Sequence, residues 1–243
     1  MLFRPKERRK KQRAERKAAG AGTRRIASII LFLAPLVLFY VNRDMTLTLS
    51  MFGMFGFYLL VPNFIVPEIN KLTMEKKTSD PQIVSTLGFL RTDLTILRSN
   101  IILFLCCAVL LVSVILGRNT TDLEMMLSLL SYVVMNILLS MAIMFKFSTE
   151  VYSRKKYFMT LDQIGFVKEE REKIIFREVS MLYATILAVA LLYLVNIFIS
   201  MIIHGNLTWG HAGLLILFMI IPMVICYGIS ILYYRRSVMV ELS

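Results

Sequence analysis

The sequence predicts an all-α membrane protein with six transmembrane helices, cytoplasmic amphipathic helices and both termini in the cytoplasm. Three observations lead to this prediction. Hydrophobic residues make up 57% of the 243 positions and the mean hydropathy is +0.69, which excludes a soluble domain of this length. Six runs free of charged residues are each close to the ~20 residues that an α-helix needs to cross a bilayer. Finally, 26 of the 28 Lys and Arg residues fall in alternate segments between these runs.

The six runs are read directly from the sequence, and the first is the shortest. In chain order they are Ile26–Asn42, Met45–Pro67, Ile101–Gly117, Leu127–Phe145, Met181–Ile203 and Leu214–Tyr234. The cations outside them number eleven in Met1–Arg25, five in Glu68–Asn100, eight in Lys146–Ser180 and two after Tyr234. Since cytoplasmic segments carry the excess of Lys and Arg, these four segments are expected to be cytoplasmic and the three short loops external.

This topology divides the chain into four regions. A basic cytoplasmic tail (1–25) precedes a pair of transmembrane helices (26–67) and a cytoplasmic amphipathic helix (68–100). A four-span core (101–243) follows and contains the cytoplasmic segment 146–180. The net charge of +12 comes mostly from these cytoplasmic flanks, so it indicates contact with anionic lipid, above all at the basic tail. No folded nucleic-acid-binding module accompanies the charge, and no nucleic-acid partner is expected.

The segment before the third run carries its own helix signal. Asp80 is an acidic N-cap candidate and Pro81 suits the first helical position. Apolar residues then recur at spacings of four and three, which predicts one stripe on a helix. They are Ile83, Leu87, Leu90, Leu94 and Leu97. Two interpretations stay open: a helix lying at the membrane interface, or a helical connection packed under the bundle.

The segment 146–180 predicts a short helix, a turn and a second, charged helix. Tyr157, Leu161 and Ile164 form a short stripe, and Gly165 follows as a residue suited to a left-handed helix end. The second helix begins after Val167, passes Glu178 and leads into the fifth run. The surrounding charged residues are Arg154, Lys155, Lys156, Asp162 and Glu178.

These residues resemble the signature of FtsX-like ABC transporter permeases, most nearly the bacitracin-resistance type and the MacB-like members. In that family a charged stretch leads into a leucine-x-x-isoleucine-glycine element and then into a charged helix that ends in an acid before the next span. The match is good at Leu161, Ile164, Gly165 and Glu178. By this resemblance, the third to sixth runs would form the permease core, as in the C-terminal half of a ten-span member.

The resemblance implies that this chain is a permease subunit, not an enzyme, and that it couples ATP hydrolysis by a separate ABC ATPase to export or to mechanical transmission. The residues 154–164 would form the coupling helix that docks on the ATPase. Its apolar side chains would insert into a cleft of that subunit, its charged ones would set the register, and Glu178 would lie where the lever enters the membrane. The apolar ones are Tyr157, Phe158, Leu161 and Ile164, and the charged ones are Arg154, Lys155, Lys156 and Asp162.

The chain departs from the family pattern in two ways. The family has a large extracytoplasmic domain between the first two core spans, whereas here the connection Arg118–Met126 is about nine residues. The first repeat of the ten-span members is also missing, so the resemblance implies pairing with a second permease chain or a homodimer. The expected location is a plasma membrane, most simply a bacterial one.

Several kinds of chemistry are not predicted for this chain. There is no glycine-rich phosphate loop, so ATP and Mg²⁺ are expected only on the partner subunit and no cofactor on this one. The two histidines, His204 and His211, do not make a credible metal site. The charge-free runs disfavour a secondary carrier. A non-transporting membrane scaffold or assembly subunit remains the alternative function.

Overall fold

The computed structural model describes residues 22–41, 46–74, 81–115, 122–163, 165, 167–204 and 207–239. Within these residues every regular element is a helix and there is no strand. In the described part of the chain five helices are long and apolar enough to span a membrane, which supports a membrane protein. They correspond to the second to sixth runs of the sequence.

The first run, up to residue 41, lies in a helix described over residues 22–38 and a turn at 39–41. Residue 22 is also the first residue that the structure describes. The described part of this helix is not among the five candidate spans. Residues 1–21 of the basic tail lie outside the described residues, and residues 22–25 belong to this helix.

The second run forms one continuous helical rod with a local irregularity. It comprises α2 (Thr46–Leu60), a π-helical turn η1 (Val61–Ile65) and α3 (Val66–Met74). Pro62 lies in the π-turn, where its missing N–H is accommodated by the wider winding. The rod packs along the next helix through all three of its parts.

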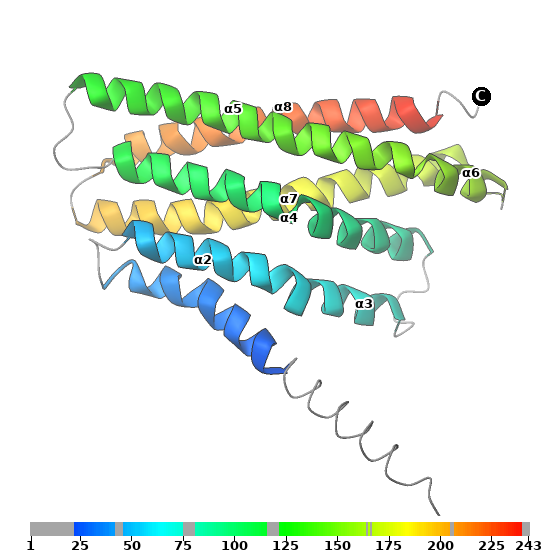
Figure 1. Cartoon of the computed structure of the whole chain (residues 1–243). Coiled ribbons are helices and arrows are strands. Elements are labelled where there is room, and N and C mark those ends of the chain that lie inside the picture. Colours follow the sequence, from blue (N-terminus) through cyan, green and yellow to red (C-terminus); the bar gives the residue numbers. More distant parts are fainter. Residues whose placement is uncertain are drawn as a thin grey trace, which may run out of the picture.

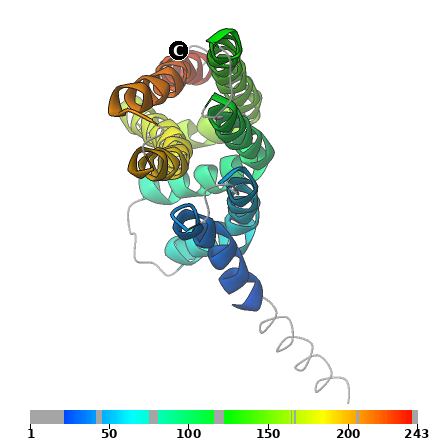
Figure 2. The same cartoon turned by 90° about the vertical axis from the view of Figure 1, so that its left-hand side faces the viewer.

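Four long helices form the main bundle: α4 (Pro81–Ile115), α5 (Asp122–Ser153), α7 (Lys168–Ile203) and α8 (Trp209–Met239). They close a ring in which α4 contacts α5, α5 contacts α8, α8 contacts α7 and α7 contacts α4. The helix of residues 22–38 and α2 lie on one side of this ring, as both views of the ribbon show (Figures 1 and 2).

The bundle helices are longer than a membrane requires. Their 31 to 36 residues correspond to about 46–54 Å, against the ~30 Å of the hydrocarbon core. The excess lies at one end, where α3, the short helix α6 (Lys155–Gln163) and the last turns of α8 are found on the right of Figure 1. We call this the α6 end of the bundle.

The amphipathic stripe lies on α4. The helix runs without interruption from Pro81 to Ile115, so the amphipathic segment is continuous with the third run. Leu90, Leu94 and Leu97 are buried in the bundle core, and Ile83 and Leu87 are half-buried beside it. The inner part of the stripe is therefore packed into the bundle core.

Candidate functional site: the ionic cluster at the α5–α6 junction

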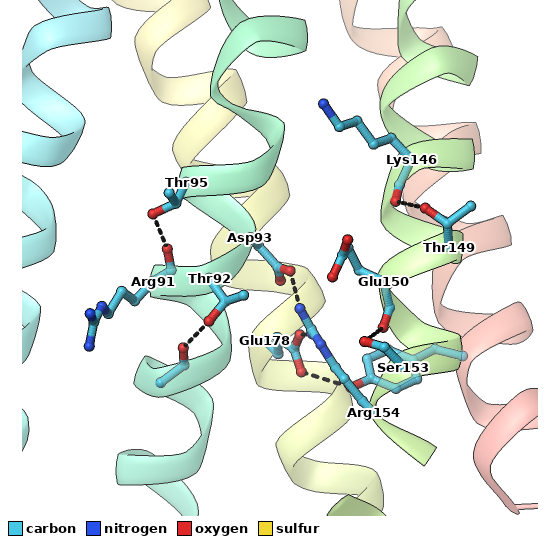
Figure 3. A network of polar contacts seen from close by, with 12 residues as sticks. Arg91, Thr92, Asp93, Thr95, Lys146, Thr149, Glu150, Ser153, Arg154 and Glu178 are labelled. Atoms are coloured by element: carbon cyan, nitrogen blue, oxygen red, sulfur yellow. Dashed lines mark hydrogen bonds and ion pairs between the residues drawn. The ribbon is translucent and has the colours of Figure 1, made fainter. Parts of the chain in front are cut away.

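The candidate site is built around Arg154, which forms the turn between α5 and α6. Its carbonyl oxygen accepts hydrogen bonds from the backbone N–H groups of Tyr157 (2.9 Å) and Phe158 (3.2 Å), so the chain resumes a helical path at once. Its own N–H donates to the carbonyl of Val151 (3.1 Å). The backbone turns at this residue while its side chain points into the bundle (Figure 3).

Two buried carboxylates hold the Arg154 guanidinium. Nη2 pairs with Asp93 of α4, and Nη1 pairs with Glu178 of α7. Arg154 is 6% exposed and both acids are fully buried. The Tyr234 hydroxyl of α8 donates a hydrogen bond to Glu178 Oε2 at 3.0 Å. All four helices of the ring therefore meet at this cluster.

Aromatic rings enclose the charged groups. The Arg154 guanidinium carbon lies 4.8 Å from the centroid of the Phe89 ring and 5.9 Å from that of Phe147. The Phe158 ring packs on both Phe89 and Tyr234, with centroid distances of 5.9 Å in each case. Cation–π attraction strengthens when water is excluded, so this cage favours a charged Arg154 at a buried position.

The cluster carries more acid than base. Asp93, Arg154 and Glu178 sum to a formal charge of −1. Glu150, one turn before Arg154 on α5, points toward the same space (Figure 3) and interacts electrostatically with Asp93. Buried charges cost several kcal/mol each unless they are paired. The arrangement is suited to holding helices in a fixed relation. Among the described residues no cluster of three or more His, Cys, Asp or Glu side chains is placed to hold a metal ion.

Further contacts fasten α6 to its neighbours. Arg171 of α7, almost fully buried, pairs with Asp162 at 2.8 Å. Tyr157 is hydrogen-bonded through its hydroxyl to Ser85 of α4 at 3.0 Å, and its ring packs edge-on against Phe89. Gly165 has φ +96°, the left-handed conformation that the turn into α7 requires and that favours glycine. α6 is therefore attached to both α4 and α7.

The structure places the predicted coupling residues on two faces of α6. Phe158 (0% exposed) and Leu161 (6%) face the bundle, not the exterior, because the cage and the α7–α8 surface bury them. Lys156, Tyr157 and Asp162 are exposed and Lys155 is half-buried. Ile164 lies outside the described residues. Arg154 and Glu178, expected on the docking surface and at the membrane entry, are partners in the buried cluster.

Three members of the cluster were not singled out by the sequence: Asp93, Glu150 and Tyr234. Asp93 follows Leu90 by three positions and precedes Leu97 by four, which puts it at the edge of the apolar stripe. An acid at the edge of a buried stripe is a usable signal for a buried ion pair. No such signal marks Tyr234, which ends a purely apolar run.

No protein family, curated protein or solved structure matches this chain.

Proposed function

We propose that this chain is the transmembrane permease subunit of an FtsX-like ABC transporter, which couples ATP hydrolysis on a separate subunit to export or to mechanical transmission. One observation carries the proposal. α6 is a short helix at the end of the bundle, and the residue that joins it to α5 is paired with both α4 and α7. A displacement of α6 is thereby transmitted directly to two other long helices.

The proposal includes six spans, with both termini and the α6 end in the cytoplasm of a bacterial plasma membrane. The helix of residues 22–38 would be the remaining span. It is held to α7 by hydrogen bonds from the Tyr193 hydroxyl to the Phe32 carbonyl (2.5 Å) and from Ser200 Oγ to the Phe39 carbonyl (2.9 Å). A short span is accommodated by local thinning of the bilayer at modest cost.

The docking surface for the ATPase would be the outward face of α6. Lys156, Thr160 and Gln163 follow one another at spacings of four and three and are all exposed. They lie opposite Phe158 and Leu161, which fix the helix to the bundle. Docking would thus use polar contacts on a helix that is already anchored from behind.

Movement of the docked ATPase would act through the ionic cluster. Closure of that subunit on ATP and Mg²⁺ would shift α6, and Arg154 would draw Asp93 and Glu178 with it. Since α7 continues from Glu178 into its apolar run, the shift would tilt α7 against α4 and α8. A second permease chain, or a second copy of this one, would complete the transporter.

The decisive experiment is affinity purification of the tagged chain from its native membrane in mild detergent, with mass spectrometry of the co-purifying proteins. We expect an ABC ATPase with the wild type and its loss with Thr160→Arg, which places a bulky cation in the centre of the outward face. Leu161→Asp is a poorer choice, because Leu161 is buried and its replacement would disturb the packing of α6 itself.

The matched control is Thr149→Arg. Thr149 is also exposed, and its hydroxyl likewise bonds to a carbonyl one helical turn earlier, but it lies on α5 and not on α6. Retention of the ATPase by Thr149→Arg and its loss from Thr160→Arg would support the proposal. Recovery of no ATPase from any of the three proteins would contradict it and favour the scaffold alternative.

A further inference from the structure

A groove runs along the outer side of the α7–α8 pair, outside the ionic cluster. Toward the α6 end it is an open cavity of about 490 Å³, lined by Glu169, Glu172, Lys173, Ile175, Phe176, Arg177, Ile231 and Arg235. One helical turn further along both helices it continues as an apolar cavity of about 210 Å³. The lining of this second part is Ser180, Tyr183, Ala184, Leu187, Met223, Val224 and Tyr227.

The two cavities share one face of each helix. On α7 the lining residues recur at spacings of three and four from Glu169 to Leu187, and on α8 at spacings of four from Met223 through Tyr227 and Ile231 to Arg235. Residues at these spacings lie above one another on a helix surface. The two cavities therefore lie in line along the α7–α8 pair, and we call them together the groove.

The charged part of the groove presents unpaired cations. Glu172 and Arg235 pair with each other, with both carboxylate oxygens 3.1 Å from Nη2. Among the described residues Lys173 and Arg177 have no ion-pair partner, and both are exposed. Beside them the Phe176 ring is 56% exposed. The wall thus offers two free cations next to an apolar surface.

Hydroxyl groups mark the transition to the apolar part. Ser180 Oγ is hydrogen-bonded to the Tyr227 hydroxyl, and the Tyr183 hydroxyl to Ser230 Oγ, at 2.8 Å in both cases. These groups satisfy one another, so they leave a wall of rings and aliphatic carbon facing the groove. Beyond them Leu187 and Met223 line the rest of the apolar cavity.

The part of the groove from Arg177 to Leu187 has the length of one lipid leaflet. Arg177 and Leu187 are ten residues apart on α7, which corresponds to about 15 Å along the helix. This is half of the ~30 Å hydrocarbon core. Arg177 also precedes the charge-free run by four positions, where the headgroup region is expected.

We propose that this groove is a binding site for an anionic phospholipid from the leaflet at the α6 end. The phosphate would lie between Lys173 and Arg177, and an acyl chain would follow the groove past Ala184 to Leu187. The two cations would attract the negative charge of the headgroup, and the apolar cavity would bury part of the acyl chain. The site requires a membrane-embedded bundle but no ATPase partner, so it stands or falls independently of the proposed function.

The test is binding of phosphatidylglycerol and of phosphatidylcholine to the detergent-purified chain, followed by native mass spectrometry over a lipid titration. The wild type is expected to retain phosphatidylglycerol preferentially. The double variant Lys173→Gln, Arg177→Gln should weaken that binding on the order of tenfold, because each cation near an anionic headgroup contributes substantially to the attraction. Arg236→Gln, an exposed cation on α8 outside the groove, should leave it unchanged.

The apolar part is tested separately with Ala184→Trp, which fills the apolar cavity. Ser131, a small exposed residue within the α5 candidate span and outside the groove lining, supplies the control Ser131→Trp. Weaker binding with Ala184→Trp alone would support the site. Three results would each overturn the proposal. The wild type could bind the two lipids equally, Arg236→Gln could weaken phosphatidylglycerol binding as much as the double variant does, or Ala184→Trp could leave that binding unchanged.

Discussion

Arg154 is the shared partner of the two buried carboxylates, Asp93 and Glu178, at the α6 end of the bundle. A buried ion pair is weak support for stability compared with apolar packing, but removing one member is costly because the others are left uncompensated. Here one guanidinium forms ion pairs with two buried carboxylates from different helices. The cluster therefore fixes how α4, α5 and α7 are placed relative to one another.

The first prediction concerns loss of this guanidinium. Arg154→Met should destabilise the protein by about 3–5 kcal/mol, because Asp93 and Glu178 stay buried without their cation. The measurement is the midpoint of thermal or denaturant unfolding in detergent. Combining Arg154→Met with Asp93→Asn and Glu178→Gln should recover part of the loss, since neutral groups are cheaper to bury.

Arg91→Met is the control for this series. Arg91 is an exposed arginine of α4 that bonds to Asn70 at 2.7 Å. Its replacement should change stability by about 1 kcal/mol or less, as for other exposed polar pairs. A loss as large as that of Arg154→Met would argue against the cluster as the source of the effect.

A second prediction separates two neighbouring tyrosines. Tyr234→Phe removes the hydroxyl that donates to Glu178, and should cost about 1.5–3 kcal/mol because the acceptor is a buried carboxylate. Tyr233→Phe, at an exposed position of the same helix, should be neutral within about 0.5 kcal/mol. Unfolding midpoints of the two variants compare them directly, and equal effects would refute the assigned role of Tyr234.

At the scale of elements, the packing of the helix of residues 22–38 against α2 depends on close approach of their backbones. A Cβ placed on Gly56 would lie 2.6 Å from backbone atoms of Leu31 and Phe32, and one on Gly53 would meet the Tyr193 ring. The backbone atoms cannot move aside as a flexible side chain can. Glycine is required at Gly56 for this packing, as at many helix contacts in membranes.

The third prediction follows from this contact. Gly56→Ala should destabilise the protein by about 1–3 kcal/mol through overpacking and loosen the helix of residues 22–38. The matched variant is Gly88→Ala on α4, where an added Cβ meets no atom within 4 Å. This variant should be neutral or up to about 1 kcal/mol more stable, because alanine favours the helix. Unfolding midpoints check both, and limited proteolysis near residue 22 should detect loosening only in Gly56→Ala.

At the scale of the whole molecule, the helix ends define two opposite sides. α6 lies at one end, and the start of α8 lies at the other (Figure 1). If the α6 end is cytoplasmic, cysteines introduced at exposed positions of the two ends will differ in their access from outside the cell. The native cysteines, Cys106, Cys107 and Cys226, all lie within candidate spans.

The fourth prediction is therefore a topology test. In intact cells a membrane-impermeant maleimide should label Gly210→Cys, and it should label Thr160→Cys only after the membrane is permeabilised. Both positions are exposed in the structure. The wild type provides the background of the native cysteines. Labelling of Thr160→Cys in intact cells would reverse the proposed orientation.

The sequence by itself determined the helical, membrane-embedded class of the protein. In lipid each spanning segment must satisfy its backbone hydrogen bonds internally, and a charge-free run of about 20 residues does so as a helix. Five of the six predicted runs correspond to candidate spans among the described residues. It also located the short helix that became α6 and the glycine that ends it, because Gly165 adopts the positive φ its position indicated. The first run differs, since its described helix is not among the five candidate spans.

Only the tertiary structure decided which side chains of α6 and α4 face inward. Amphipathic spacing shows that an apolar stripe exists but not which surface covers it. From the sequence, Phe158 and Leu161 were therefore equally compatible with burial in a cleft of a partner and with burial in their own bundle. The ionic cluster joins residues 24 to 61 positions apart on different helices, Asp93, Arg154 and Glu178, and no local pattern relates them. Burial of an ion pair is set by the helices that exclude water around it, and that property belongs to the assembled bundle.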